Sequence, residues 1–553
     1  MSTSRAVLGG EIMKSTMQES KLSIPALVRR GATLFPESKV FTFDGMTSSV
    51  QSFATTAKRA AQFANSLKTI GVKRDDCVAT FCFNHNVHLE AYLAIPSCGA
   101  IMHTLNIRLF SEQLQFIIDD AQDKVILVDG AVIGLLARIL PSLPSVEQLI
   151  VVGDFDQKLR PLLNVKIHDY EELISGESSD FEWEEPLVET DAAAMCYTSG
   201  TTGDPKGVVY SHRSTWLHSN SVSSSIGLAS NDRVLVVVPM FHVNAWGLPY
   251  AAWLTGCDLV LPGRYLQAPY LVKMISELRP TIASGVPVIW NDLIQYAKHN
   301  EVDFSSLRMV SSGGSAAPNS LIEAFENDYQ IPLIQGWGMT ETSPICTLSI
   351  PPDGTPKDKQ LRYLETAGKA VAGVTLRVVD DAGYVLEHDG KAQGEIQVTG
   401  PWITASYFKG RNPECFDGIW LRTGDIGTID EEGYLKITDR TKDVIKSGGE
   451  WISSVELENM LMDHEAVYEA TIVGVPDVKW QERPLACIVL MPDAKVKPEE
   501  LRDFLVGKVA RWWIPERWAF VEEIPKTSVG KFNKRVVRDL YAKGEISVIN
   551  IDN

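Results

Sequence analysis

The chain has 553 residues, with 52 lysines and arginines against 70 aspartates and glutamates, which gives a formal charge of -18. At usual domain sizes of about 100 to 200 residues, this length predicts more than one domain. A hydrophobic fraction of 45% with 22% charged residues is typical of a folded protein and excludes disorder as the main state. The acidic balance, without a dense basic run, argues against extended nucleic-acid binding.

Neither the amino terminus nor the cysteines indicate export or a zinc site. The first residues lack the apolar core that a secretory signal needs, so we expect a cytoplasmic protein. The uncharged stretch 234–257 is long enough to raise the question of a membrane span. Because Pro239, His242, Asn244 and Pro249 interrupt it, the sequence favours a buried strand, turn and helix. The eight cysteines form no CxxC pair and have no zinc-like neighbours, which is typical of reduced structural thiols.

Short β-branched runs alternate with helix-like segments in the first two thirds of the chain. These runs predict strands at 76–84, 124–129, 148–153, 233–239 and 258–263. Because they are continuously apolar, we expect strands buried on both faces, as in a parallel sheet. The segment 269–280 has helical spacing and ends at a proline. The alternation predicts an α/β fold.

After about residue 365 the pattern changes to strands separated by Gly and Asp turns. The segments 373–380, 394–400 and 433–439 predict a smaller β-rich portion. A compact mixed region follows, with helices expected over 450–464 and 498–510 and strands over 470–477 and 485–493. This change indicates a boundary at Asp439-Arg440, which divides the chain into domains 1–438 and 439–553.

The segment YTSGTTGDPKGVVYSH, residues 197–212, has the composition of a phosphate-binding loop. Three glycines let the backbone turn tightly and bring N–H groups close to phosphate. The glycines are Gly200, Gly203 and Gly207, and the accompanying donors are Thr198, Ser199, Thr201, Thr202 and Lys206. The segment is not a Walker loop, because Lys206 follows Pro205 and precedes a glycine where Ser or Thr would stand.

Four further motifs follow in order along the chain. They are QGWGMTET (335–342), WLRTGD (420–425), TDRTKDVIKSGGEW (438–451) and PKTSVGK (525–531). Together with the phosphate loop, they resemble the acyl-adenylate-forming superfamily of acyl-CoA synthetases, luciferases and peptide-synthetase adenylation domains. The resemblance covers nearly the whole chain and is closest to medium- and long-chain fatty acyl-CoA synthetases. It implies a large α/β adenylation domain with a β-rich subdomain, plus a small mobile carboxyl-terminal α+β domain.

Glycines and an aromatic ring indicate an adenine pocket. The paired Gly313 and Gly314 permit close approach of a flat ligand, and Trp337 offers an aromatic face to a purine. The resemblance places Gln335 and Gly336 on the wall of this pocket. The family more often has tyrosine at the position of Trp337.

Carboxylates and a lysine at matched positions imply the chemistry. Glu341 is a hard oxygen ligand of the kind that ATP-bound magnesium takes in small number. By resemblance Glu341 and the Thr198 hydroxyl hold Mg²⁺, Thr340 contacts the nucleotide and Asp425 accepts both ribose hydroxyls. Lys531 would bridge the substrate carboxylate and the α-phosphate. Because that carboxylate is already ionised near neutral pH, the step needs charge neutralisation and positioning rather than a general base.

The boundary region carries cations and glycines with implied roles in a domain rotation. The resemblance implies Asp439 as the hinge, Arg440 as a nucleotide contact, Lys442 and Lys446 as further cations of the closed state, and Gly448 and Gly449 as the loop that approaches CoA.

The segment 238–254 predicts an acyl-binding wall. If helical, it places His242 and Trp246 on adjacent turns. By resemblance His242 lies beside the carboxylate, Val243, Trp246 and Gly336 line the acyl site, and Trp451 gates it. Because the VPMFHVNAWG part of the segment contains no cation, it favours an apolar acid.

The sequence thus predicts an acid:CoA ligase that uses ATP, Mg²⁺ and CoA to form acyl-AMP and then acyl-CoA. Alternatives are a ligase for an aryl, branched, sulfur-containing or steroid side-chain acid, and an enzyme that loads a separate carrier protein. A luciferase-like oxygenase and a catalytically silent nucleotide sensor are further alternatives. The fatty-acid relatives also imply a homodimer.

Overall fold

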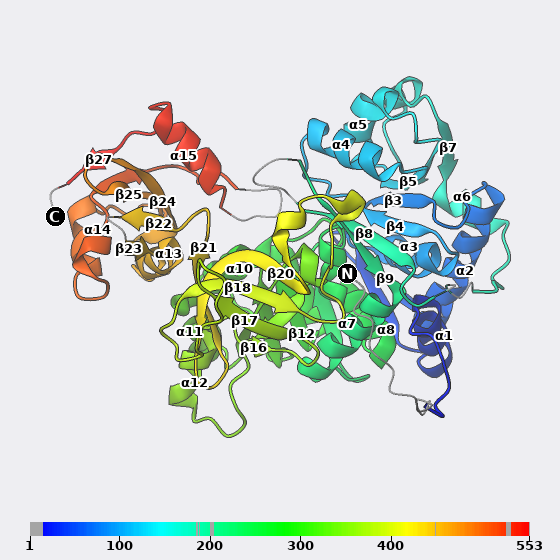
Figure 1. The fold of residues 1–553 in the computed structure, drawn as a ribbon. Coiled ribbons are helices and arrows are strands. Elements are labelled where there is room, and N and C mark those ends of the chain that lie inside the picture. Colours follow the sequence, from blue (N-terminus) through cyan, green and yellow to red (C-terminus); the bar gives the residue numbers. More distant parts are fainter. Residues whose placement is uncertain are drawn as a thin grey trace.

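The computed structural model describes residues 15–183, 186, 188–198, 204–447, 450–526 and 532–551, without the side chains of Glu450 and Trp451. A large body carries a smaller carboxyl-terminal unit at one side (Figure 1). The predicted α/β fold class, with its β-rich portion and smaller carboxyl-terminal domain, is confirmed. Several residues predicted for the site lie outside the described part of the chain: Ser199, Gly200, Thr201, Thr202, Gly203, Gly448, Gly449 and Lys531.

A seven-stranded sheet, counted over the described residues, has the order β7-β6-β5-β3-β4-β8-β9. Its strands run parallel apart from the antiparallel pair β8 and β9. β3 and β5 are buried along their whole length, as the continuous apolar runs predict. The strands are β3 (Cys77–Phe81), β4 (Ile101–Thr104), β5 (Val125–Asp129), β6 (Gln148–Val152), β7 (Lys166–Asp169), β8 (Ala192–Tyr197) and β9 (Gly207–Ser211). The helices of this part are α2 (Phe53–Thr69), α3 (Asn86–Ser97), α4 (Ser111–Ala121), α5 (Ile133–Ile139) and α6 (Tyr170–Ser175).

A second sheet, nine-stranded within the described ranges, has the order β16-β15-β14-β13-β12-β10-β11-β1-β2. Its centre is parallel and its two edges are antiparallel. The strands are β1 (Lys39–Phe43), β2 (Ser48–Ser52), β10 (Arg233–Val236), β11 (Asp258–Leu261), β12 (Ile282–Gly285), β13 (Met309–Gly313), β14 (Leu333–Gly338), β15 (Ile345–Leu348) and β16 (Lys369–Ala370). The helices are α1 (Ile24–Leu34), α7 (His212–Ser225), α8 (Leu248–Thr255), α9 (Ala268–Leu278), α10 (Pro287–Ala297), α11 (Asn319–Asp328) and α12 (Lys357–Leu364).

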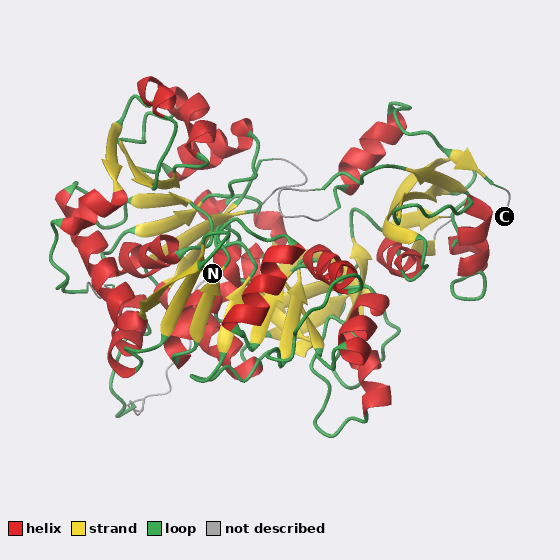
Figure 2. Cartoon of the chain, turned by 180° about the vertical axis from the view of Figure 1, so that it is seen from behind, coloured by secondary structure: helices red, strands yellow, loops and turns green. Residues whose placement is uncertain are grey.

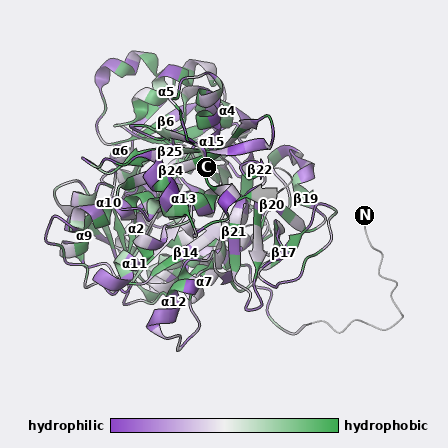
Figure 3. Cartoon of the chain, turned by 90° about the vertical axis from the view of Figure 1, so that its left-hand side faces the viewer, coloured by the Kyte–Doolittle hydropathy of each residue, from purple (hydrophilic) through white to green (hydrophobic). Residues whose placement is uncertain are grey.

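The hydrophobic core runs through the large body without a break between these two sheets. One continuous cluster includes α1 and α2 as well as strands of both sheets, and Trp253 and Trp290 are among its fully buried side chains. Apolar residues accordingly gather inside the layers, as Figure 3 shows. The uncharged stretch 234–257 belongs to this core as β10, a turn and α8, as predicted. In the part of the chain that the structure describes, no helix has the length and apolarity to cross a bilayer.

An antiparallel β-rich subdomain follows, in the order β17-β18-β20-β19, with β21 paired to β20. Its strands are β17 (Thr375–Val379), β18 (Gly394–Thr399), β19 (Phe416–Asp417), β20 (Trp420–Ile429) and β21 (Leu435–Arg440). The three strands predicted for this region are confirmed as β17, β18 and β21. Across the last pair, Asp425 faces Arg440 and Ile426 faces Asp439. The end of β21 therefore lies against the body of the protein.

The carboxyl-terminal unit is a mixed sheet, β23-β22-β25-β26-β27 with β24 on β25, covered by three helices of the described chain (Figure 2). Its elements are β22 (Ile445–Ser447), β23 (Glu450–Ile452), α13 (Ser454–Met462), β24 (Val467–Asp477), β25 (Gln481–Leu490), α14 (Pro498–Leu505), β26 (Arg517–Phe520), α15 (Lys534–Ala542) and β27 (Ile549–Asn550).

Both helices predicted in this unit are shorter than the sequence pattern indicates. The first starts at Ser454 rather than 450, because Ser453 caps it by accepting a hydrogen bond from the Glu456 N–H, and the preceding residues pair with β22. The second ends at Leu505, since Val506 is extended and Gly507 has a φ of +81°. Hydrophobic periodicity therefore extends the first predicted helix ahead of its N-cap and the second past its stop signal.

The eight cysteines are free thiols; Cys415 is half-buried and the others are buried.

Among the described residues, Cys82, His85 and Asp129 bring their ligand atoms within 4.8 Å of one another, a grouping that the sequence spacing did not suggest. His85 Nε2 lies 2.8 Å from Asp129 Oδ1, and the second Asp129 oxygen accepts the Phe83 N–H. His85 and Asp129 are therefore partners of each other, while the Cys82 thiol donates to the Leu127 carbonyl at 3.5 Å.

Buried charges connect the end of β21 to the carboxyl-terminal helices. Asp439 is 1% exposed, and its Oδ2 accepts hydrogen bonds from the Ser454 N–H at 2.7 Å and hydroxyl at 2.5 Å. The Lys534 Nζ lies 2.8 Å from Glu458 Oε1 and also donates to the Ser454 hydroxyl. Burial alone would lower the pKa of Lys534, but the carboxylates of Glu458 and Asp439 outweigh it and raise that pKa.

We predict that Lys534→Met lowers the free energy of unfolding by about 3 kcal/mol, because it leaves two buried carboxylates without their cation. Urea denaturation followed by tryptophan fluorescence measures the change. Lys543→Met, at an exposed position just after α15, is the matched control and should stay within about 0.5 kcal/mol. Equal stability of the two variants would contradict the role of the buried charge network.

Candidate active site

A cavity of about 1030 Å³ opens between the large body and the carboxyl-terminal unit. It lies beyond the carboxyl ends of β13 and β14, where ligands of parallel sheets usually bind. Most of the described site residues predicted from the sequence line it, namely Thr198, Lys206, His242, Val243, Trp246, Gly314, Gln335, Gly336, Trp337, Thr340, Glu341, Asp425, Asp439, Arg440 and Lys442. Lys446 does not: it is exposed, and its backbone N–H donates to Glu482. The Trp451 side chain lies outside the description.

The β8–β9 hairpin brings the described ends of the predicted phosphate loop, Thr198 and Lys206, to the cavity wall. At its base the Thr198 N–H donates to the Lys206 carbonyl at 2.9 Å, and the Lys206 N–H donates to Thr198 Oγ1 at 3.3 Å. The Lys206 ammonium lies 4.9 Å from the centre of the Tyr407 ring. The hairpin therefore presents one hydroxyl and one cation to the cavity from the two ends of the loop.

Asp120 on α4 connects this hairpin to the segment that contains Lys409 and Arg411. Its carboxylate accepts the Tyr197 hydroxyl at 2.8 Å and forms ion pairs with Lys409 at 2.8 Å and Arg411 at 2.6 Å. Burial opposes ionisation, but these hydrogen bonds and charges lower the pKa of Asp120 below its ordinary value. The sequence did not predict this ion-pair cluster around Asp120, because its members lie far apart along the chain.

Glu341 lies in the short 3-10 turn Thr340–Thr342 and is 5% exposed. Its Oε1 accepts the Tyr407 hydroxyl at 2.6 Å, and its carbonyl accepts the Thr404 N–H at 2.8 Å. Burial raises the pKa of Glu341, while the hydrogen bond from Tyr407 and the nearby charges of Arg440 and Lys206 partly lower it. Tyr407 was not predicted, because a tyrosine in a loop gives no sequence signal for a contact with a distant carboxylate.

The donor set at this point fits a magnesium ion. Glu341 and the Thr198 hydroxyl line the same cavity and supply hard oxygens, and Mg²⁺ in nucleotide sites takes one or two protein oxygens beside phosphates and waters. The residues present are therefore compatible with the predicted metal.

The predicted adenine wall is formed by the ends of β13 and β14. Gly314 follows β13 with a φ of +88°, a conformation that side-chain-bearing residues rarely adopt. The Gln335 amide accepts the Ala317 N–H at 2.7 Å and donates to the Leu364 carbonyl at 2.7 Å. Gln335 therefore fixes the loop after β13 by its side chain, in addition to lining the cavity.

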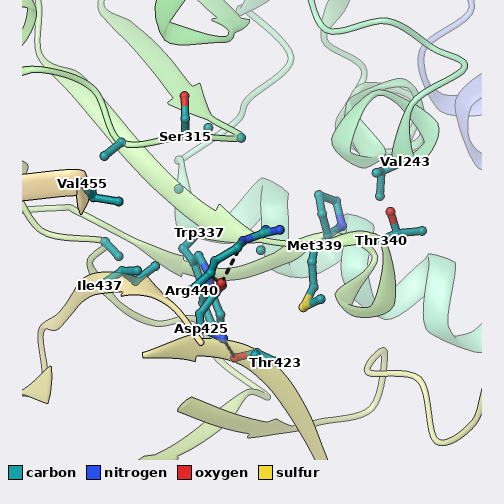
Figure 4. Close-up of a pocket in the computed structure, with 18 of the residues that line it drawn as sticks. Val243, Ser315, Trp337, Met339, Thr340, Thr423, Asp425, Ile437, Arg440 and Val455 are labelled. Carbon is teal, nitrogen blue, oxygen red and sulfur yellow. Dashed lines mark hydrogen bonds and ion pairs between the residues drawn. The ribbon is translucent and has the colours of Figure 1, made fainter. Parts of the chain in front are cut away.

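Trp337, Asp425 and Arg440 meet on the wall of the cavity (Figure 4). The Trp337 indole N–H donates to Asp425 Oδ2 at 2.8 Å, and the Arg440 Nε lies 3.2 Å from Asp425 Oδ1. The three residues come from β14, β20 and β21. This cluster joins the nine-stranded sheet, the β-rich subdomain and the strand that leads into the carboxyl-terminal unit.

The segment after His242 differs from the helical spacing considered for it. Val243 to Trp246 have φ values of +45°, +49°, +48° and +57°, so the chain forms a left-handed turn before α8 starts at Leu248. Such residues cost about 1–2 kcal/mol each. The Asn244 side-chain oxygen helps to hold the turn. It accepts hydrogen bonds from the Thr104 hydroxyl and the Cys196 thiol, each at 3.4 Å. His242 and Trp246 both line the cavity even so.

Comparison with known proteins identifies the family. The profile described as AMP-binding enzyme matches residues 28–408, and that of the AMP-binding enzyme C-terminal domain matches residues 456–531. The 3-methylmercaptopropionyl-CoA ligase of Ruegeria lacuscaerulensis is 40% identical over 96% of this chain and 99% of its own. The long-chain-fatty-acid–CoA ligase of Thermus thermophilus is 42% identical over 95% and 97%. The crystal structure of the anthranilate CoA ligase AuaEII with anthranoyl-AMP superposes with a TM-score of 0.86 at 27% identity, covering 96% of this chain and 100% of the other.

The chain therefore belongs to the AMP-binding, adenylate-forming enzymes, and its activity is that of an ATP-dependent, AMP-forming acid:CoA ligase.

We predict that Tyr407→Phe moves the acid limb of the pH profile of kcat/KM for ATP to higher pH by about one unit. The hydrogen bond from Tyr407 stabilises the ionised form of Glu341. Its removal therefore raises the pKa of Glu341, and on acidification the ionised form is lost at a higher pH than in the wild type. Initial rates from pH 5 to 9 at fixed Mg²⁺ measure this shift. Tyr434→Phe, whose hydroxyl donates to the Ile350 carbonyl, is the control, and an identical profile for both variants would refute the assignment.

Proposed function

We propose that this ligase activates an apolar carboxylic acid of medium or long chain. The observation that carries the proposal is the composition of the part of the cavity lining that we assign to the acyl chain and call the acyl arm. Its lining from the chain around β4, α4, α7 and the left-handed turn contains no Asp, Glu, Lys or Arg among the described residues. It consists of Thr104, Asn106, Leu109, Ile117, Val222, Ile226, Phe241, His242, Val243, Trp246 and Leu248. Arg108 lies 6.0 Å from the centre of the Phe241 ring but is not part of this lining. A hydrocarbon chain would therefore be well accommodated here, whereas a charged tail would have to reach past Phe241 for a partner.

In the first half-reaction, a carboxylate oxygen of the acid attacks the α-phosphorus of ATP, and pyrophosphate leaves. Lys206 and the loop around Ser199, Gly200, Thr201 and Thr202 would hold the phosphates. Glu341 and Thr198 would hold Mg²⁺, which would neutralise phosphate charge. Lys531 would bring the two anions together, and the ring of His242 would lie beside the carboxylate.

In the second half-reaction, the thiol sulfur of CoA attacks the acyl carbon, the bond to phosphate oxygen breaks, and AMP leaves with that oxygen. We propose that domain 439–553 rotates about Asp439 between the two steps. The rotation would withdraw Lys531 and present Gly448 and Gly449 to CoA, while Arg440, Lys442 and Lys446 would follow the changing charge of the nucleotide. Trp451 would gate the acyl arm.

A sulfur-containing acid is a second candidate substrate. It is supported by the 40% identity to a relative named as a 3-methylmercaptopropionyl-CoA ligase. Such an acid is short and also apolar, so it suits the same uncharged arm. The homodimer and the cytoplasmic location stay predictions.

Competition among acids tests the proposal. Purified protein receives ATP, Mg²⁺, CoA and an equimolar panel of straight-chain acids of increasing length, 3-(methylthio)propionate, aryl acids and a steroid side-chain acid, and the thioesters are read by mass spectrometry. We expect medium- or long-chain thioesters to dominate. Methylthiopropionyl-CoA as the main product would favour the second candidate. Aryl or steroid thioesters as the main products would refute the assignment of the uncharged lining to a hydrocarbon chain. Acyl-AMP without a thioester would indicate that a carrier protein is the acceptor.

We predict that Gly313→Ala lowers kcat/KM for the preferred acid about five- to thirtyfold relative to acetate. A Cβ at Gly313 would lie 3.0 Å from Cη2 of Trp246 and 3.2 Å from the Gly336 carbonyl oxygen. The indole then has to give way by a few tenths of an ångström, and we expect this displacement to narrow the acyl arm at a cost of about 1–2 kcal/mol. Steady-state kinetics with both acids measure the ratio. Gly176→Ala, where a Cβ meets nothing within 4 Å, is the control, and an unchanged ratio for Gly313→Ala would show that Trp246 does not border the acid.

A further inference from the structure

Trp337 forms a hydrogen bond that its expected role as an adenine-facing ring does not explain. Its indole N–H donates to Asp425 Oδ2 at 2.8 Å, and bonds to an ionised acceptor are about twice as strong as neutral ones. The ring also packs on the small core of the β-rich subdomain, which includes Val378, Ile396 and Leu435. Trp337 is thus fixed by packing and aims its one polar group at the carboxylate.

A hydrogen bond and an ion pair define the rotation of the Asp425 carboxylate. Trp337 holds Oδ2, and the Arg440 Nε lies 3.2 Å from Oδ1. The backbone is fixed as well, since the Asp425 N–H donates to Thr423 Oγ1 at 3.1 Å, and Figure 4 shows these contacts together. The side chain of Asp425 is only 8% exposed, so water does not supply a competing set of partners on most sides.

The acceptor capacity that remains matches a ribose. An ionised carboxylate offers about four lone-pair sites, two on each oxygen. Trp337 uses one site on Oδ2, and Arg440 forms an ion pair at Oδ1, so each oxygen keeps at least one site for a further donor. Vicinal hydroxyl groups supply two such donors, one for each oxygen.

We propose that Trp337 is a positioning residue for ribose recognition, which acts by fixing Asp425 through its indole N–H. This inference rests on the proposed function of Asp425 as the ribose carboxylate. The role does not depend on stacking against adenine, because a phenylalanine could stack but could not donate. The tyrosine that is more usual in the family would place its hydroxyl elsewhere than the indole nitrogen.

Calorimetric binding of AMP, 2′-deoxy-AMP and 3′-deoxy-AMP tests the proposal without acid or CoA. We expect the wild type to prefer AMP over both analogues. In Trp337→Phe, the affinity for AMP should fall about tenfold, the usual consequence of losing a hydrogen bond to a charged group. The affinities for the deoxy analogues should fall less, so the preference for the ribonucleotide shrinks.

Two comparisons separate positioning from general damage. Trp518→Phe removes another indole hydrogen bond, to the Pro515 carbonyl at 3.0 Å, and neither residue lines the cavity, so it should leave the preference unchanged. In an Asp425→Ala background, Trp337→Phe should have almost no further effect on AMP binding. Should Trp337→Phe fail to fold, as judged by thermal unfolding, Trp337→Tyr is measured in its place and should show a reduced preference.

The proposal is overturned if the Trp337 variant keeps the full ribose preference, if it loses affinity for all three nucleotides equally, or if the effect persists without Asp425. A wild type that binds the three nucleotides equally would also overturn it, by removing the role of Asp425. None of these outcomes depends on acyl-CoA formation. Failure to make a thioester, with ribose preference intact, would instead count against the proposed function alone.

Discussion

The pairing of Asp425 with Arg440 is the contact on which the arrangement of the site depends. The two residues face each other across β20 and β21, and Trp337 ties the same carboxylate to the nine-stranded sheet. One residue before Arg440, Asp439 is bonded to the start of α13 in the carboxyl-terminal unit. Asp425 therefore links the large body and the β-rich subdomain to Arg440, which directly follows the proposed hinge residue Asp439. A change of partner at Asp425 would affect all three parts.

Electrostatics sets a second constraint, because an acidic protein must collect anionic ligands. Against a net charge of -18, the cavity lining includes Lys206 beside β9 and Arg440 and Lys442 at and just after the end of β21. Partial desolvation lowers the pKa of Lys442, and the neighbouring positive charge of Arg440 adds to the effect. Phosphates and a carboxylate would relieve this repulsion, so binding of the substrates and alignment of the domains can stabilise each other.

Much of the fold could be predicted from the sequence, because continuous apolar runs and Gly/Asp turns report burial and chain reversal directly. The strands β3, β5 and β21 lie where those patterns indicate. The turn at Val243 to Trp246 could not be foreseen, since its left-handed backbone is held partly by Thr104 and Cys196, which are distant in sequence. The motifs identified Glu341 and Asp425, but Tyr407, Asp120 and Lys534 emerged only when the fold brought their partners together.

The fate of one oxygen atom tests the central claim most directly. The accepted acid, labelled with ¹⁸O in its carboxylate, is incubated with the enzyme, ATP, Mg²⁺ and CoA, and the nucleotide product is examined by mass spectrometry. The two half-reactions predict AMP that carries one ¹⁸O atom, because the carboxylate oxygen that attacks the α-phosphorus leaves with it. Unlabelled AMP, or label in inorganic phosphate alongside ADP, would contradict an acyl-adenylate intermediate and with it the function assigned to this cavity.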